Sequence, residues 1–221
     1  MATSRHAWFP AACAAALMGM SASGAWAEDT ELKEVFTYSE LRVGYSTIEA
    51  PSIRQRKPDD KVASIDEDKY GSRFGLTYLS GSAPSDSWVG KVWGAQLSIS
   101  TYSLNVDGEG TSLTQPMIDV YYGWQYGIIE TQGLRGFAEL LPYIGAGVSH
   151  LELEDKARIG AALEAGLRAG AYLTERNWEL GLTASYQLGL SKIYYTIGDD
   201  KRIFELDANG VSFGVEGGYR F

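Results

Sequence analysis

The stretch WELGLTASYQLGLS, Trp178 to Ser191, alternates between apolar residues and polar or very small residues at every position. The apolar series begins with Trp178 and Leu180, and the other series begins with Glu179 and Gly181. A period of two residues places the two series on opposite faces of a β-strand. The alternation lasts much longer than the roughly five or six residues of a typical strand in a soluble protein. The stretch therefore predicts a long strand with one apolar and one polar face.

Seven further stretches show the same period. Their lengths fit a strand that crosses a bilayer at a tilt, which takes about 9–11 residues. Because backbone polar groups cannot stay unpaired in lipid, strands cross a membrane only as a closed barrel, and eight is an allowed strand number. We predict an all-β fold, an eight-stranded antiparallel up-and-down transmembrane β-barrel. The predicted strands are 38–49, 70–80, 89–101, 118–128, 138–149, 159–173, 178–191 and 211–221.

A soluble lipocalin-like barrel is the alternative architecture, and it has the opposite polarity, with apolar residues inside and charged residues outside. The polar face of the predicted strands is dominated by Gly, Ser and Thr. We expect these residues to be too small and too polar to build a core. The composition of this face therefore favours the membrane barrel.

Residues 1–27 have the layout of a cleaved secretory signal peptide. An early basic residue precedes an apolar run, and Ala-Trp-Ala at 25–27 forms an A-x-A cleavage site. The apolar run is shorter than the about 20 residues that a spanning helix needs. Cys13, the only cysteine, lies in this segment, so the mature chain has no thiol for a disulfide or a metal site. We expect a mature barrel domain of residues 28–221.

The charge of the chain limits its partners. The formal net charge is -9 at pH 7, whereas proteins that bind nucleic acid carry basic patches, so we expect no nucleic-acid partner. After residue 27 no apolar stretch is long enough for a spanning helix. The acidic residues Asp199, Asp200, Glu205 and Asp207 could hold Ca²⁺, but their spacing matches no cation-binding loop. We therefore predict neither a metal nor a cofactor.

The connections between the predicted strands alternate in length. The long or strongly charged ones are 50–69, 105–115, 150–157 and 196–210, and the short ones are 82–87, 130–136 and 174–177. Outer-membrane barrels have short periplasmic turns and longer external loops, which predicts that both termini are periplasmic. Outward aromatic residues then form a girdle near the periplasmic side: Tyr78, Trp93, Trp124, Tyr126, Trp178, Tyr219 and Phe221.

Two stretches carry a resemblance to a known family. PYIGAGV, Pro142 to Val148, is similar to a strand motif of small outer-membrane barrels, and the ending GVEGGYRF looks like the C-terminal signal read by the barrel-assembly machinery. The whole mature chain resembles the eight-stranded OmpA/OmpX-like barrels of Gram-negative bacteria. The resemblance implies an outer-membrane location among phospholipid and lipopolysaccharide, and an assembly signal at Tyr219 and Phe221. It names no biochemical activity, and we expect a monomer.

The lumen is the first candidate site. An eight-stranded barrel is only just wide enough for its inward side chains to fill it. If Leu173 pairs with Trp178, and Phe221 lies level with Trp178, then Arg168 and Glu216 flank Thr183. Arg220 then lies opposite Glu179. We predict a neutralised polar network made of Arg42, Arg168, Glu179, Glu216 and Arg220. The two-residue alternation places these charged residues on the inward face: Glu40, Arg42, Arg73, Asp119, Glu139, Glu164, Arg168, Glu179, Glu216 and Arg220.

Three functions fit this arrangement. We predict a non-enzymatic outer-membrane barrel with surface-exposed loops that serves envelope integrity or surface interaction, with the loops open to an external ligand. A narrow channel for small solutes or ions is the alternative, favoured by the small inward residues Gly181, Ser185, Gly214 and Gly218. A lipid A-modifying enzyme is less favoured. His150 is the only histidine of the mature chain, and its neighbour Ser149 points to the other face.

Overall fold

The computed structural model describes residues 35–56, 62–64, 66–67, 69–84, 89–106, 109–131, 133–153, 156–197 and 200–221. The predicted signal peptide, 1–27, and the acidic residue Asp199 lie outside this part of the chain. Nothing in the described ranges forms a helix that is long and apolar enough to cross a membrane. Residues from Val35 to Phe221 form one compact unit that is built from β-strands.

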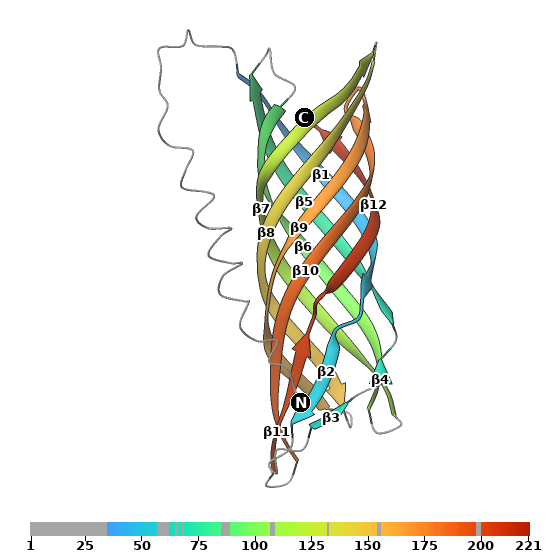
Figure 1. Cartoon of the computed structure of the whole chain (residues 1–221), viewed down its shortest axis with the longest axis vertical. Helices are drawn as coiled ribbons and strands as arrows, with labels where there is room; N and C mark the ends of the chain where they lie inside the picture. The colour runs from blue at the N-terminus through green and yellow to red at the C-terminus, as the bar shows by residue number, and fades with distance from the viewer. Residues whose placement is uncertain are drawn as a thin grey trace, which may run out of the picture. The chain divides into compact units, whose positions relative to one another are not determined.

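Eight strands form a closed antiparallel ring (Figure 1). Neighbours along the chain pair with each other, and the ring closes because β12 pairs with both β10 and β1. The predicted eight-stranded up-and-down barrel is confirmed. The ring consists of β1 (Val35–Glu49), β5 (Tyr70–Pro84), β6 (Val89–Val106), β7 (Glu109–Thr131), β8 (Leu134–Leu153), β9 (Lys156–Glu175), β10 (Trp178–Ile197) and β12 (Gly210–Arg220).

Four shorter strands extend the sheet at one end of the barrel, the lower end in Figure 1. β11 (Asp200–Asp207) pairs with the end of β10, β2 (Ser52–Arg56) pairs with β11, and β3 (Val62–Ser64) pairs with β2. β4 (Asp66–Glu67) pairs with β6. Residues 105–115, 150–157 and 196–210, predicted as loops, therefore lie mostly in strands, and that prediction is wrong.

Toward this end of the barrel, the outer face of the strands changes from apolar to polar and the inner face from polar to apolar. Along β6, Leu97 and Ile99 are exposed on the outer face while Ser98 is buried in the lumen. Four residues further along, Ser103 is exposed on the outer face while Leu104 is buried inside. An apolar outer face suits lipid, whereas an apolar inner face with a polar outer face is the arrangement of a barrel in water. The switch on β6 falls between Ile99 and Thr101.

The same switch occurs on the neighbouring strand. On β7, Ile118 is exposed outside and Asp119 is buried inside, whereas nearer the hairpin Ser112 is exposed and Leu113 is buried. We call the part of the barrel beyond the switch the extension. It contains residues 101–106, 109–115, 150–153, 156–160 and 192–197 together with β2, β3, β4 and β11, and on β9 and β10 its outer face still carries the exposed residues Ile159 and Tyr194. The switch explains the wrong loop predictions, because an outward apolar series was the pattern that defined a strand.

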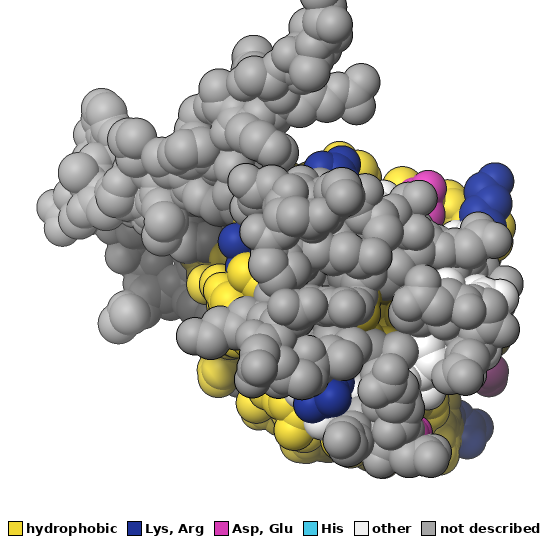
Figure 2. Space-filling view, turned by 90° about the horizontal axis from the view of Figure 1, so that it is seen from below, with side chains coloured by type: hydrophobic (Ala, Val, Ile, Leu, Met, Phe, Trp, Pro, Cys, Tyr) yellow, Lys and Arg dark blue, Asp and Glu magenta, His cyan; other side chains and the backbone are white. Residues whose placement is uncertain are grey.

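The apolar outer band occupies the rest of the barrel wall. Leu180 and Leu182 are both 68% exposed, and the end-on view shows hydrophobic side chains along the outer wall (Figure 2). The aromatic residues of the predicted girdle all face outward, and two of them, Trp178 and Tyr219, pack edge to face with ring centroids 5.1 Å apart. The outward set is Tyr78, Trp93, Trp124, Tyr126, Trp178, Tyr219 and Phe221.

The turn between β9 and β10 sets the register of the lumen residues. It consists of Arg176, which has a φ of 55°, and Asn177, so Trp178 pairs with Glu175 and not with Leu173. The predicted register is therefore wrong by two residues, and Phe221 is likewise not level with Trp178, which pairs with Tyr219. A shift of two residues keeps each side chain on its face. Three lumen pairings change: Arg168 pairs with Ser185 rather than Thr183, Glu216 pairs with Gly181, and Glu179 pairs with Gly218.

Candidate functional site

The lumen of the membrane-facing part is organised around Arg42, whose side chain is completely buried. Nη1 and Nη2 of Arg42 each donate to one carboxylate oxygen of Glu139, at 2.7 Å. Nη2 also donates to Glu40 at 2.5 Å, and Nε donates to Glu179. This fork engages three carboxylates at once and is the kind of charge-assisted contact that orders a buried polar group.

Arg220 joins this group from the C-terminal strand. Its Nη2 lies 2.8 Å from Glu40 Oε2 and 3.6 Å from Glu179 Oε2. Its guanidinium carbon stands 4.1 Å from the ring centroid of Tyr38 and 4.9 Å from that of Phe137. Cation–π contacts at such distances add to the ion pairs. The side chain of Arg220 thus covers the charged group on the side of the short turns.

A second charged group lies next to the first. Arg168 and Glu216 form an ion pair, and Tyr172 OH donates to Glu216 Oε2 at 2.8 Å while accepting from Arg168 Nη2 at 2.8 Å. The Tyr172 ring also lies 4.0 Å from the guanidinium carbon of Arg42, so it links the two groups. Gly44 makes room for Glu216, because a Cβ there would stand 2.7 Å from Glu216 Cγ.

The structure brings the five predicted network residues together in these two linked groups. Arg42, Glu179 and Arg220 belong to the first group, and Arg168 and Glu216 form the second. Three residues outside the predicted network are essential to it: Glu40, Glu139 and Tyr172. Glu40 and Glu139 face inward by parity, but parity cannot reveal that one arginine binds both. Tyr172 also lies on the inward series, where an aromatic residue among glycines was an available signal.

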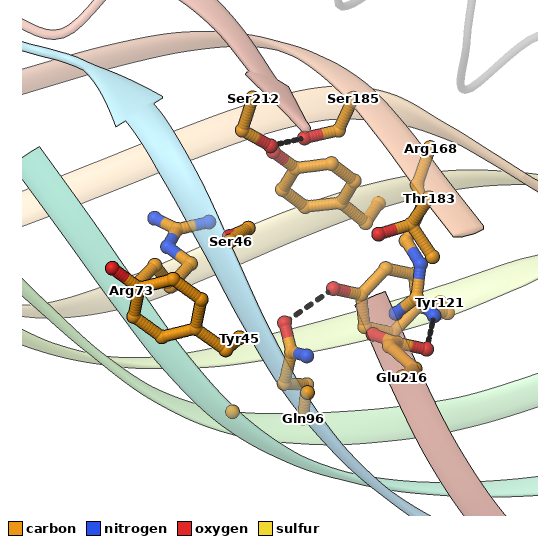
Figure 3. A pocket seen from close by; sticks show the side chains of 13 residues that line it. Tyr45, Ser46, Arg73, Gln96, Tyr121, Arg168, Thr183, Ser185, Ser212 and Glu216 are labelled. Atoms are coloured by element: carbon orange, nitrogen blue, oxygen red, sulfur yellow. Dashed lines mark hydrogen bonds and ion pairs between the residues drawn. The ribbon is translucent and has the colours of Figure 1, made fainter. Parts of the chain in front are cut away.

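A small cavity lies beside the second group (Figure 3). Its volume is about 30 Å³, which is room for only one to a few water molecules. Hydroxyl groups gather on its wall, and Ser185 and Ser212 are hydrogen bonded at 2.6 Å. Tyr121 OH donates to Gln96 at 2.8 Å. The cavity is lined by Gly44, Tyr45, Ser46, Arg73, Gly75, Gln96, Tyr121, Tyr143, Arg168, Thr183, Ser185, Ser212 and Glu216.

Acidic side chains outnumber arginines in this lumen. Arg73 donates to Glu164 and to Ser100, both at 2.8 Å. Asp119 is fully buried, and neither of its carboxylate oxygens has a hydrogen-bond partner among the described residues. A buried carboxylate without a partner is costly. A water molecule, a bound proton or a cation would stabilise Asp119 at this position. The charged residues are Arg42, Arg73, Arg168 and Arg220 against Glu40, Asp119, Glu139, Glu164, Glu179 and Glu216.

An apolar cluster fills the lumen of the extension, and we call it the apolar plug. Phe204 from β11 is completely buried there, together with residues from β1, β2, β6, β7, β8 and β10. The plug consists of Ile48, Ile53, Tyr102, Leu104, Leu113, Leu151, Ile193, Phe204 and Leu206. A second buried cluster, beside the charged groups, contains Tyr38, Leu79, Val92, Tyr121, Leu141 and Tyr143. The expectation that the inner face is too small and polar to build a core is therefore wrong.

The candidate catalytic and metal-binding residues do not form sites in the described part of the chain. Ser149 is buried, and its Oγ contacts Gln115 at 2.6 Å and Ser191 at 2.7 Å, whereas His150 is half-exposed on the outer face. The two side chains thus point away from each other. Glu205 forms an ion pair with Lys192 at 3.3 Å. No three His, Cys, Asp or Glu side chains of the described ranges are grouped to hold a metal ion.

Comparison with known proteins gives structural likenesses. No protein-family model and no curated protein matches the sequence. The outer membrane protein OprG from Pseudomonas aeruginosa is 15% identical over 86% of this chain and 98% of its own, with a TM-score of 0.48. Ail, the attachment invasion locus protein of Yersinia pestis, is 18% identical over 83% and 98%, with a TM-score of 0.35. The outer membrane protein AlkL is 13% identical over 90% and 96%, with a TM-score of 0.40. At these sequence identities and TM-scores, the likenesses assign no role to this chain. The barrel is established by the strand pairing of the structure itself.

Proposed function

We propose that this chain is a non-conducting, non-enzymatic β-barrel of the outer membrane that serves envelope integrity or surface interaction. The apolar outer band supports the membrane location, because a soluble protein rarely exposes so large a continuous apolar surface. The switch of polarity supports a protein that stands partly in lipid and partly in water. The extension then presents a surface to the outside of the cell.

The closed lumen is the observation that carries the non-conducting role. A solute entering from the short turns meets Arg220 and then the group around Arg42. A solute entering from the extension meets the apolar plug, where Leu113 and Leu151 are buried. Between these two barriers, in the described part of the chain, lies a small cavity of about 30 Å³. Transport would require both barriers to move.

The position of the chain end supports the orientation that we propose. Phe221 and Ser39 exchange two backbone hydrogen bonds, of 2.8 and 3.0 Å, so the C-terminus and the start of β1 lie at the same end of the barrel, opposite the extension. We propose that this end is periplasmic. Lipid and lipopolysaccharide then surround the barrel, any external ligand meets the extension, and Tyr219 and Phe221 serve the barrel-assembly machinery as an insertion signal.

A narrow channel is the second candidate. The small cavity and the excess of lumen carboxylates over arginines favour a path for water or small cations between the two barriers. The plug would then act as a gate instead of a permanent seal. This candidate predicts conductance that opens and closes in steps.

Planar-bilayer recording on the refolded full chain separates the two functions. We expect no conductance steps across a range of voltages in potassium chloride, with a general porin as the positive control. Cation-selective steps in most insertions would refute the non-conducting role and support the channel. Insertion itself is checked in parallel by the heat-modifiable gel mobility of the recovered protein, so that an empty bilayer is not read as a closed barrel.

A further inference from the structure

Two acidic side chains, Asp119 and Glu164, lie on either side of Gly145 in the lumen. Gly145 of β8 pairs with Asp119 of β7 and with Glu164 of β9, so the three residues form one row across neighbouring strands. A Cβ at position 145 would stand 2.0 Å from Asp119 Oδ1 and 3.1 Å from Glu164 Cγ. Both acidic side chains therefore reach over the glycine, into the space that a larger residue would fill.

The two carboxyl groups have one cation between them. Arg73 Nη2 donates to Glu164 Oε2 at 2.8 Å, and Arg73 Nε donates to Ser100. The other oxygen of Glu164, Oε1, and both oxygens of Asp119 are buried and accept no hydrogen bond from a described residue. Two ionised carboxylates in such a place repel each other strongly, because the protein interior screens charge poorly.

The nearby side chains do not supply a second positive charge for the pair. Ser98 of β6 and Tyr143 of β8 are buried, and their hydroxyl groups have no partner in the described part of the chain. A neutral hydroxyl can donate a hydrogen bond to a carboxylate, but it cannot offset a full charge. Arg168, four residues after Glu164 on β9, is already engaged by Glu216.

The remaining strands add no charge at the level of the pair. Ser46 of β1 pairs with Arg73, and Gly189 of β10 pairs with Glu164. On β12, Gly214 pairs with Ser46. This part of the lumen therefore holds one carboxylate more than it holds guanidinium groups. Its titratable side chains besides the pair are Arg73 of β5, Tyr102 of β6, Tyr121 of β7, Tyr143 of β8, Arg168 of β9 and Glu216 of β12.

A proton suits the pair better than a metal ion does. The cavity of about 30 Å³ borders Arg73 (Figure 3), but Asp119 and Glu164 are not among the residues that line it. A hydrated ion needs room at the carboxylates, whereas a proton needs none. A proton on Asp119 allows this side chain to donate to Glu164 Oε1, while Arg73 keeps Glu164 Oε2. Carboxyl groups that are held close together commonly share one proton in this way.

We propose that Asp119 and Glu164 form a proton-binding site in the lumen, in which protonated Asp119 donates a hydrogen bond to ionised Glu164. The inference goes beyond the proposed function, because it gives the closed lumen a response to pH. Arg73 connects the site to the apolar plug, since it also contacts Ser100, two residues before Tyr102 of the plug. Loss of the proton to the solvent leaves a second carboxylate charge beside the plug. The folded barrel therefore becomes less stable as the pH rises.

The pH dependence of unfolding counts this proton. In the unfolded chain both carboxyl groups are ionised above about pH 5, whereas the folded barrel keeps one proton, so unfolding releases it. The unfolding equilibrium constant of wild type, divided by that of Asp119→Asn, should therefore rise about tenfold per pH unit above about pH 5.5, until the folded barrel also loses the proton. Glu130→Gln, in an exposed ion pair, is the matched control and should keep the wild-type dependence.

Urea unfolding in lipid vesicles at constant ionic strength measures these three proteins. Parallel pH curves for wild type and Asp119→Asn would overturn the proposal. A difference between the two that follows the concentration of sodium or potassium instead of the pH would also overturn it, and would indicate a bound cation. Heat-modifiable gel mobility reports whether each chain has inserted, so failure of the barrel is seen separately from absence of the proton.

Infrared spectroscopy of the wild-type chain provides a second measurement that does not need the variant to fold. Asp119 is the only aspartate that is buried in the described ranges, and exposed aspartates are ionised at neutral pH. We expect a carbonyl band of a protonated carboxylic acid at neutral pH, and we expect it to move to lower frequency in protein grown with ¹³C-carboxyl aspartate. A spectrum without an acid band that responds to this label would refute the assigned proton.

Discussion

Replacing Arg42 by Met removes the centre of the charged lumen while keeping a side chain of similar length. The guanidinium contacts Glu40, Glu139 and Glu179, and all four side chains are buried. In the variant Arg220 keeps its contacts with Glu40 and Glu179, whereas Glu139 loses both of its hydrogen bonds to a guanidinium. Removing one partner of a buried ion pair typically costs about 3–5 kcal/mol, because the remaining charge is left without compensation. We expect a loss of unfolding free energy of about this size.

The structure also identifies a change that should restore part of this loss. Both hydrogen bonds of Glu139 to a guanidinium go to Arg42, at 2.7 Å each. Adding Glu139→Gln to Arg42→Met removes one uncompensated charge, and about 1–3 kcal/mol should return. Arg135→Met is the matched control, since Arg135 and Glu130 form an exposed pair with side chains 47% and 54% accessible. That pair should contribute no more than about 1 kcal/mol.

Urea unfolding in lipid vesicles, followed by tryptophan fluorescence, measures all four proteins under one condition. The expected order of stability is wild type, nearly equal to Arg135→Met, then the double variant, then Arg42→Met. Equal stability of Arg42→Met and wild type would show that the lumen network does not hold the barrel together. A double variant that is less stable than Arg42→Met would refute the assignment of Glu139 as an uncompensated charge.

Three further predictions follow from the same structure. In intact cells a membrane-impermeant maleimide should label Gly110→Cys, in the extension, and leave Thr131→Cys unlabelled; the opposite pattern would reverse the orientation. Deleting Phe221 should sharply lower insertion in cells while the purified chain still refolds in detergent, as judged by heat-modifiable mobility, and the loss of a buried ring is at most about 1.5–3 kcal/mol; normal insertion in cells leaves this residue a packing role alone. His150→Ala should leave the lipid A profile unchanged by mass spectrometry at matched expression, and a changed acyl composition would support an enzyme.

The alternation of the sequence was enough to predict the barrel, because outward leucines such as Leu180 and Leu182 are separated by single lumen residues. It also placed Arg42 and Glu216 correctly in the lumen, since facing depends only on parity. The register of the strand pairs was harder to predict from the sequence. The tight turn at Arg176 and Asn177 moved the pairing of Trp178 by two residues, and a sequence pattern of period two is unchanged by such a shift.

The extension was missed for a different physical reason. Its strands keep the two-residue period, but the solvent on their outer face changes from lipid to water. Leu113 and Leu151 therefore face inward, and Ser112 faces outward. A search for outward apolar residues reads such a segment as a polar loop. The same period with reversed polarity, directly continuous with a predicted membrane strand, would have been the signal for it.

The central claim is tested most directly by measuring whether fluorophores attached along β6 lie in lipid or in water. The claim is that one barrel wall passes from lipid into water between Ile99 and Thr101. Leu97→Cys and Ser103→Cys lie on the same outer face of the same strand, and each can carry the same fluorophore in a Cys13→Ser chain inserted in vesicles. We predict that a lipid-bound quencher reduces the emission of the label at 97, and that aqueous iodide reduces the emission of the label at 103. Quenching of both labels by iodide alone, or of both by the lipid-bound quencher alone, would contradict the account.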